Sequence, residues 1–517
     1  MTRREGAIAV HRFGMGARPG ELSQAARDPK TWLLEQVSAE KALPEQLQGF
    51  PDTASYYVGY VNRYRQRGEW RRQQALVDPE SDDYARLSRI IKRQSGSFAA
   101  YYREAWMLEF AARFNAAAMT TTPFRERLIR FWSNHLVVPV AKQPVLLYVG
   151  SYEREVIRPH IAGRFSDMLK ASAQHPGMLI FLDNDKSVGP NSRFGRKNDV
   201  GLNENLAREI LELHTLGVDG GYTQDDVIAL AKGISGWSIA RVDAGDGNPG
   251  TFHFKRNMHE PGPVTLLGKT YREDGVARGE QMLDDLAHHP ATARFLATKL
   301  ARHFVDDEPS EQIVSHLANV YLEHDTDLGA MTRALVARPE AWTNLYAKLR
   351  QPEDYVTTVM RALGRNLLAD EVERPGVYDF EQYEPRTRRY GFLYDNRENF
   401  PTPAEIAKFP RHAQVGIEIV RMFNLIMDMG QTPMAAPGPQ GWYDRVSDWS
   451  GADSIMKRVE FGVDMAHRSS GNIEPDVLVD ETLGPIASDD LRRSVSRAAD
   501  KAQGLALLLT SPEFQRR

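Results

Sequence analysis

Residues 202–215, LNENLAREILELHT, gather the side chains best suited to chemistry. A helix here would bring four polar groups to one face, since they recur at i, i+3, i+4 and i+7: Asn205, Arg208, Glu209 and Glu212. The other side would be mostly apolar and would pack: Leu206, Ile210, Leu213 and His214. Gly217 is a typical helix stop. The polar face would therefore present an amide, a guanidinium and two carboxylates.

The carboxylates of this face point to glycosidic cleavage, which uses one protonated and one ionised carboxyl group. We expect Glu209 and Asp183 to be the acid/base pair, because Asp183 ends the apolar run 178–182 at the edge of a packed element. Glu212 would replace Asp183 if that residue is remote. The alternative is a solvent-exposed face whose side-chain pairs contribute about 0.2–0.5 kcal/mol each. Asp183 would then only cap a helix.

Substrate-binding candidates come from the same face, from the other side of the same helix and from three further segments. Histidine, arginine and asparagine suit an anionic or hydroxyl-rich ligand, and a tryptophan ring could stack on a sugar face. The candidates are Asn205, Arg208, Trp132, His135, Arg158, His160, His214 and His259. A lone histidine in a well-patterned segment is more often a hydrogen-bonded structural residue, and a tryptophan is more often core.

Two other functions fit the same residues. His135, His160 and Glu209 could form a metalloenzyme site, because nitrogen and oxygen ligands suffice for zinc, iron or manganese. The protein could also be a non-catalytic glycan-binding or scaffold protein. The chain contains no cysteine, which excludes thiol catalysis, disulfides and cysteine-bound metals. No nucleotide-binding or serine-hydrolase motif occurs, so we expect no organic cofactor.

Composition limits the partners. The 517 residues carry a formal net charge of −4, which provides no general basic field for nucleic acid. No apolar run reaches the length of about 18 residues that a membrane span needs. The apolar stretch at residues 6–10 is too short for a signal peptide. We therefore expect a cytoplasmic protein acting on a small molecule or polysaccharide, or an exported one if a signal was removed.

The elements that position these residues are expected to be mainly α-helical. Long helical patterns dominate, and strand signals are confined to a small β-hairpin near 251–268. We expect a main helical domain over 1–367. Residues 368–410 are rich in Pro, Arg, Tyr and Glu and predict an irregular covering segment. Residues 411–517 predict a C-terminal helical part packed on the main domain.

Several segments together resemble a known family. They are HRFG at 11–14, FWSNH at 131–135, YEREVIRPH at 152–160, LDN at 182–184, residues 203–222 and GW at 236–237. They resemble the successive motifs of the large bacterial family catalogued as domain of unknown function 1800. The resemblance runs from about residue 7 to the C-terminus. It implies one family over nearly the whole chain, with no assigned activity. Many relatives look exported, a feature from which this chain departs.

Overall fold

The computed structural model describes residues 2–38, 42–140, 142–367 and 411–517. These residues form a mainly α-helical protein with a small β insertion, which confirms the predicted fold class. The first half contains α1 (Arg3–Ile8), α2 (Glu21–Ala25), α3 (Pro29–Ser38), α4 (Thr53–Ala75), α5 (Asp82–Met119), α6 (Pro123–His135), α7 (Val145–Tyr152), α8 (Arg158–His160), α9 (Phe165–Gln174), α10 (Pro176–Phe181), α11 (Arg193–Asn198), α12 (Asn205–Glu209) and α13 (Gln224–Gly233).

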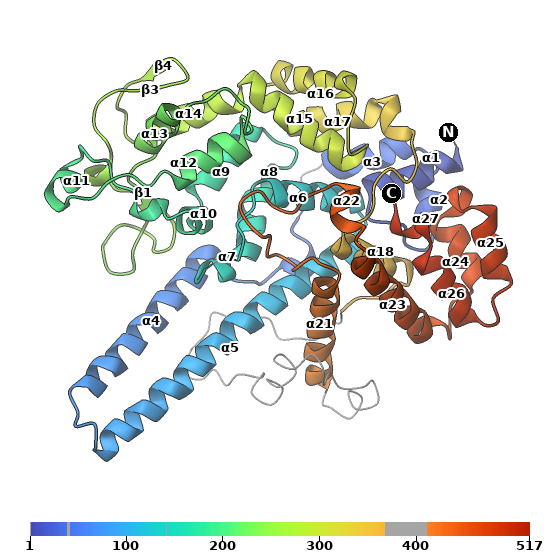
Figure 1. Cartoon of the computed structure of the whole chain (residues 1–517), viewed down its shortest axis with the longest axis horizontal. Helices are drawn as coiled ribbons and strands as arrows, with labels where there is room; N and C mark the ends of the chain where they lie inside the picture. Colours follow the sequence, from blue (N-terminus) through green and yellow to red (C-terminus); the bar gives the residue numbers. More distant parts are fainter. Residues whose placement is uncertain (1, 39–41, 141, 368–410) are drawn as a thin grey trace.

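The second half continues with α14 (Val276–Ala287), α15 (Pro290–Phe304), α16 (Glu311–Glu323), α17 (Leu328–Ala337), α18 (Pro352–Ala362), α21 (Arg411–Asp428), α22 (Val446–Trp449), α23 (Ala452–Ser469), α24 (Pro475–Thr482), α25 (Asp489–Ser496), α26 (Lys501–Thr510) and α27 (Pro512–Gln515). Helices α4 and α5 form a long hairpin that projects from the body (Figure 1). Within the described ranges, no helix combines the length and apolar character needed to cross a bilayer.

Three helical stretches are π-helical turns, in which one extra residue widens the helix. They are η1 (Ala9–Phe13), η3 (Glu153–Ile157) and η5 (Ile210–His214). η3 and η5 lie within segments that carry the family resemblance, and η1 overlaps another. The turns place His11, Glu153 and His214 in buried positions. The predicted helix at 202–215 is therefore α12 followed by η5, and Gly217 ends it with a φ of 85°.

The β insertion consists of two small antiparallel sheets. β1 (Trp237–Ile239) pairs with β2 (Phe252–Phe254), and β3 (Val264–Leu266) pairs with β4 (Lys269–Tyr271). The predicted hairpin near 251–268 contains the strands β2 and β3, but they do not pair with each other as a hairpin would require; each pairs with a strand outside that range. The turn at Leu267 and Gly268 has positive φ at both residues, the geometry of a two-residue hairpin, so β3 pairs with the next segment instead.

One large hydrophobic cluster joins the two ends of the chain. One cluster of buried side chains runs from Ala7 to Phe514 and includes residues on both sides of 368–410. Tyr355 of α18 ties the parts together, because its single hydroxyl proton is shared between the carbonyl oxygens of Arg458 at 3.1 Å and Leu509 at 3.0 Å. The predicted covering segment lies outside the described residues.

Candidate functional site

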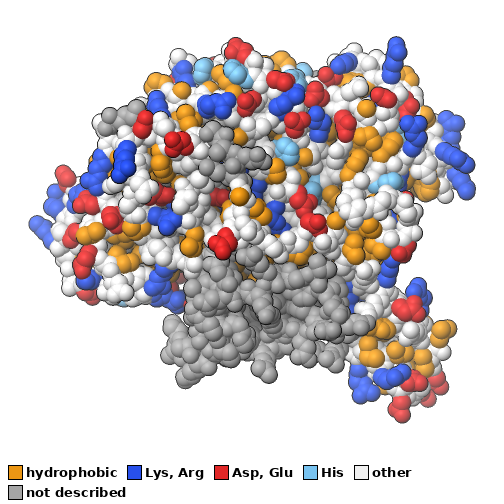
Figure 2. Space-filling view, turned by 180° about the vertical axis from the view of Figure 1, so that it is seen from behind, with side chains coloured by type: hydrophobic (Ala, Val, Ile, Leu, Met, Phe, Trp, Pro, Cys, Tyr) orange, Lys and Arg blue, Asp and Glu red, His pale blue; other side chains and the backbone are white. Residues whose placement is uncertain are grey.

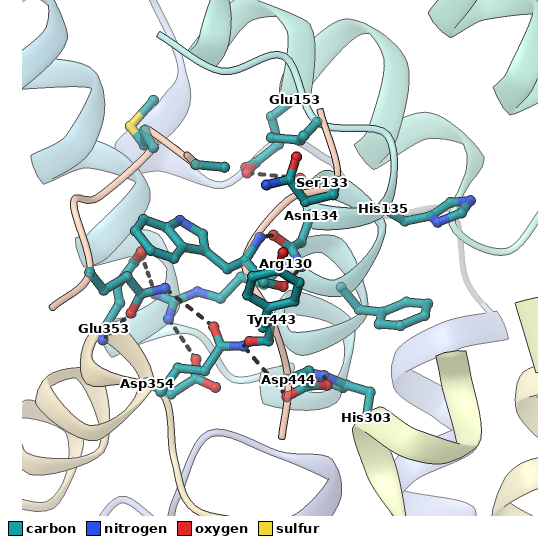
Figure 3. A pocket seen from close by; sticks show the side chains of 18 of the residues that line it. Arg130, Ser133, Asn134, His135, Glu153, His303, Glu353, Asp354, Tyr443 and Asp444 are labelled. Carbon is teal, nitrogen blue, oxygen red and sulfur yellow. Dashed lines mark hydrogen bonds and ion pairs between the residues drawn. The ribbon is translucent and has the colours of Figure 1, made fainter. Parts of the chain in front are cut away.

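A cavity of about 290 Å³ lies among α6, α15, the start of α18 and residues 431–444 (Figure 3). We call this cavity the pocket and residues 431–444 the strap. The pocket's polar lining comprises Arg113, Arg127, Arg130, Ser133, Asn134, His135, Glu153, Lys299, Arg302, His303, Gln351, Glu353, Asp354, Gln431, Gln440 and Asp444. Its aromatic lining comprises Phe131, Tyr152, Phe295, Trp442 and Tyr443. Such a concave surface with converging polar groups is typical of a ligand site.

Ion pairs hold the pocket's wall on the side of Glu153 and Glu353. Arg113 bridges Glu153 at 2.6 Å and Glu353 at 2.8 Å, and Arg130 contacts Glu353 at 3.2 Å. Burial alone would raise the pKa of Glu153, but Arg113 and Arg158 outweigh it and lower that pKa to about 2. Glu153 is therefore ionised at neutral pH.

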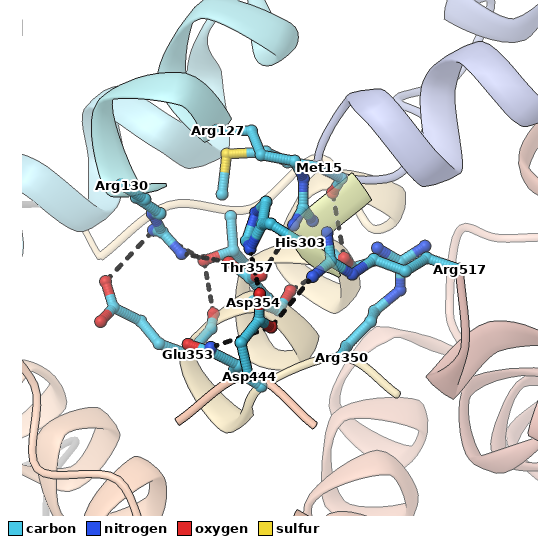
Figure 4. Close-up of polar contacts among 12 residues, drawn as sticks. Met15, Arg127, Arg130, His303, Arg350, Glu353, Asp354, Thr357, Asp444 and Arg517 are labelled. Carbon is cyan, nitrogen blue, oxygen red and sulfur yellow. Dashed lines mark hydrogen bonds and ion pairs between the residues drawn. The ribbon is translucent and has the colours of Figure 1, made fainter. Parts of the chain in front are cut away.

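A buried polar cluster continues behind this wall (Figure 4). Asp354 accepts from Arg127 at 3.0 Å and from Arg130 at 2.9 Å. Burial would raise the pKa of Asp354, but the two guanidinium groups hold it far below its ordinary value. This carboxylate is committed to ion pairs and cannot supply a proton.

The strap is fastened to the helices by side chains. Asn134 Nδ2 donates to the Trp442 carbonyl oxygen at 2.8 Å, and the Trp442 N–H donates to Asn134 Oδ1 at 2.7 Å. Gly441 permits this approach, because its φ is 76° and a Cβ there would lie 2.3 Å from the Asn134 carbonyl oxygen. A third contact joins His303 Nδ1 to Asp444 Oδ2 at 2.6 Å.

His303 is the donor in that contact. Burial lowers its pKa to about 4, so the ring is neutral at pH 7 and its Nδ1–H donates to the carboxylate. Burial would raise the pKa of Asp444, but His303 and neighbouring cations lower it to about 2. Asp444 is therefore a further ionised carboxylate of the pocket.

Lys299 differs from the other charged groups of the pocket. Its Nζ lies 3.0 Å from His135 Nδ1, and His135 Nε2 lies 3.1 Å from the His214 carbonyl oxygen. Burial and the Lys299 charge hold the pKa of His135 well below its usual range, so the ring is neutral. Its Nε2–H then donates to His214 and its Nδ1 accepts from Lys299. Burial also lowers the pKa of Lys299 to about 8, with Asp444 opposing and Arg302 adding to the shift.

The predicted catalytic face lies elsewhere. Glu209 and Glu212 are half-buried and do not line the pocket. Burial, and then Glu212, raises the pKa of Glu209, and Arg208 opposes that shift. The Tyr222 hydroxyl donates to Glu212 at 3.4 Å. Arg208 donates to its neighbour Glu204 at 3.1 Å rather than to either candidate carboxylate. Asn205, at the start of the face, is exposed.

Asp183 is bound by two lysines. Lys142 and Lys186 each contact it at 2.7 Å. Burial would raise the pKa of Asp183, but the lysines outweigh it and lower that pKa. Across the part of the chain that the structure describes, no hydrogen bond or ion pair joins Asp183 to Glu209. The two carboxylates predicted to act together are therefore not in direct contact.

Three residues predicted to bind substrate instead pack or form hydrogen bonds within the protein. Trp132 is fully buried and packs against Phe131, with ring centroids 4.9 Å apart. Arg158 is buried and donates twice to Glu126 at 2.8 Å. His160 uses Nδ1 to bond the Val156 carbonyl oxygen at 2.6 Å. None of the three lines the pocket.

Of the remaining predicted histidines, only His135 reaches the pocket. His214 lies behind it, fully buried. His259 is held between the Ser235 carbonyl oxygen at 2.7 Å and Arg278 at 2.8 Å. Within the described ranges, no three His, Asp or Glu side chains form a group that could hold a metal. The alternative ligand set of His135, His160 and Glu209 is thus not assembled.

The main residues that sequence reasoning missed are Lys299, Arg302, Asn134, Trp442 and Asp444. A signal existed for the first two, because Phe295, Lys299, Arg302 and His303 recur at helical spacing and share one face of α15. A lysine on a helix usually faces solvent, so the pattern alone does not identify Lys299 and Arg302 as pocket residues. The strap residues carry no comparable signal.

The family model described as a protein of unknown function, DUF1800, matches residues 8–516. No curated protein and no solved structure matches the chain. A match over nearly the whole length shows the family: the chain belongs to DUF1800.

Proposed function

We propose that this protein is a carbohydrate-active enzyme, a hydrolase or lyase, whose substrate binds in the pocket beneath the strap. The lining of the pocket carries the proposal. Ser133, Gln351 and Gln440 provide partly exposed hydroxyl and amide groups that can exchange hydrogen bonds with sugar hydroxyls. Trp442 and Tyr443 add aromatic surface with a polar end, which suits the two-sided character of a sugar ring.

A small molecule or polysaccharide is the favoured partner. In the face of the molecule shown in Figure 2, acidic and basic side chains are interspersed over most of the coloured surface. Together with the net charge of −4, this supports our expectation that nucleic acid is not the substrate.

The Glu209 face is a second candidate location for the chemistry. Its support is the raised pKa of Glu209 beside a second carboxylate, Glu212, because a hydrolase needs one carboxyl group that keeps its proton. Asp183 would then take part in the reaction only if one substrate molecule contacted both Asp183 and Glu209.

Incubation with a panel of polysaccharides, followed by mass analysis of the products, tests the proposal. We expect cleavage of at least one glycan by the wild-type chain. Tyr443→Ala should weaken binding of that glycan with little change in melting temperature, because the tyrosine is 62% exposed. Tyr64→Ala is the matched control, since Tyr64 is 64% exposed on α4 and does not line the pocket. No cleavage of any glycan, or equal effects of the two variants, overturns the proposal.

A further inference from the structure

The cations of the pocket fall into two groups. Arg113, Arg127 and Arg130 are each paired with one or two carboxylates of the wall. Lys299 and Arg302, both on α15, have no carboxylate within 4 Å in the described part of the chain. Arg302 Nε donates to the Asp307 carbonyl oxygen at 2.9 Å, which leaves its terminal nitrogens for another acceptor. Two adjacent, partly exposed cations without an acidic partner favour an anionic ligand.

A hydrogen bond to His135 also fixes the orientation of the Lys299 side chain. His135 Nδ1 accepts from its Nζ, and the opposite side of that ring is committed to the His214 carbonyl oxygen. The lysine is thus held at the pocket by a neutral acceptor rather than by an ion pair. An amine in this setting can lose its proton without breaking a salt bridge.

We infer that the substrate is an acidic polysaccharide built of uronate-type sugars, that Arg302 binds the substrate carboxylate, and that Lys299 is the base of a β-elimination. This inference rests on the proposed function and names its substrate class and reaction.

The elimination balances without a co-reactant. The neutral Lys299 amine takes the proton from the carbon that carries the carboxylate. The electron pair of that C–H bond forms a carbon–carbon double bond as the bond from the neighbouring carbon to the glycosidic oxygen breaks. The leaving oxygen then takes a proton from the Lys299 ammonium or from water. Arg302 compensates the negative charge that gathers on the carboxylate during proton removal.

The same pocket is poorly suited to hydrolysis. Glycoside hydrolysis needs a carboxyl group that remains protonated near neutral pH. Glu153, Asp354 and Asp444 all have lowered pKa values and are bound to cations or to His303. The pKa of Lys299, at about 8, instead lies in the range where a base works efficiently.

The test compares polygalacturonate and alginate with neutral glycans. Elimination gives an unsaturated product that absorbs ultraviolet light and whose summed mass contains no added water. Lys299→Met should lower turnover about 10²–10⁴-fold, and Lys299→Arg should not rescue it, because arginine keeps its proton. Arg294→Gln, an exposed change on the same helix, should leave turnover unchanged.

Binding separates the roles of the two residues. Titration with galacturonate oligomers should give a Kd for Lys299→Met close to wild type and a Kd for Arg302→Gln raised roughly tenfold or more. Cleavage of glycans with addition of water, or cleavage of neutral glycans only, overturns this inference and leaves the proposed function standing. Absence of any glycan binding overturns both.

Discussion

The carboxamide of Asn134 and the backbone of Trp442, 308 positions apart in the chain, exchange two hydrogen bonds of 2.8 and 2.7 Å. This reciprocal contact fixes the strap over α6 and so closes one side of the pocket. It depends on a glycine at position 441, because a side chain there would meet Asn134.

Asn134→Ala should loosen the strap. The change leaves the N–H and carbonyl groups of Trp442 without partners, at a cost of about 1–3 kcal/mol of unfolding free energy. Hydrogen exchange at strap amides should accelerate, while exchange in α23 should not change. Ser133→Ala, next to it, is the control. Unchanged hydrogen exchange at the Trp442 amide in Asn134→Ala would show that the Asn134–Trp442 hydrogen bonds do not hold the strap.

Lys299 should produce an alkaline pH dependence of stability. Its pKa falls from 10.5 in the unfolded chain to about 8 in the fold, so the unfolded chain binds more protons between these values. The contribution of Lys299 to unfolding free energy should therefore increase as pH rises from about 8 to 10.5, on the order of 1–2 kcal/mol after allowing for its partial exposure.

Denaturation of wild type and Lys299→Met across this range measures that difference. The charged or titratable groups around Lys299 are His135, His214, Arg302, His303 and Asp444, and all remain in the variant. Lys197→Met, at an exposed position on α11, is the control. A constant difference between Lys299→Met and wild type contradicts the lowered pKa.

His303 should produce an acid dependence. Its pKa is lowered from 6.5 to about 4 by burial, so protonation favours the unfolded chain and stability should fall as pH drops from 6.5 to 4. His303→Gln should reduce the slope by up to about 1.4 kcal/mol per pH unit. His324→Gln, at an exposed histidine, should leave the slope unchanged. Equal slopes for both variants would rule out a buried neutral His303.

Glu209→Gln separates the two candidate sites. Because Arg208 is bound to Glu204 and Gln224, the substitution leaves no unpaired charge, and the melting temperature should stay within a few degrees of wild type. If the pocket performs the reaction, turnover should also stay near wild type. A loss of turnover of about 10²-fold or more, with stability retained, would move the chemistry to the Glu209 face.

The spacing of residues within a segment predicted its secondary structure, but it did not predict the location of the pocket. The spacing of Leu206, Ile210, Leu213 and His214 predicted the packed side of the central helix; Leu206, Ile210 and His214 are buried, and Leu213 is half-buried. The pocket, in contrast, is built from segments as distant in the chain as Arg113 and Asp444, and the Asn134–Trp442 contact joins positions 308 residues apart. A periodic pattern within one segment does not predict contacts between segments that are so far apart in the chain. The burial that lowers the pKa of Lys299 likewise depends on packing rather than on its neighbours in sequence.

In the π-helical turn η5, the hydrogen bonds of a regular α-helix and the geometry of the site oppose each other, and a single residue decides between them. Removing one residue from η5 would restore an ordinary α-helix and rotate everything after it by about 100°. The shortened helix would gain regular hydrogen bonds, yet it would turn His214 away from His135. An in-frame loss of one codon could thus yield a well-folded helix with a dismantled pocket. The π-helical turn thus keeps His214 beside His135 at the cost of regular α-helical hydrogen bonds.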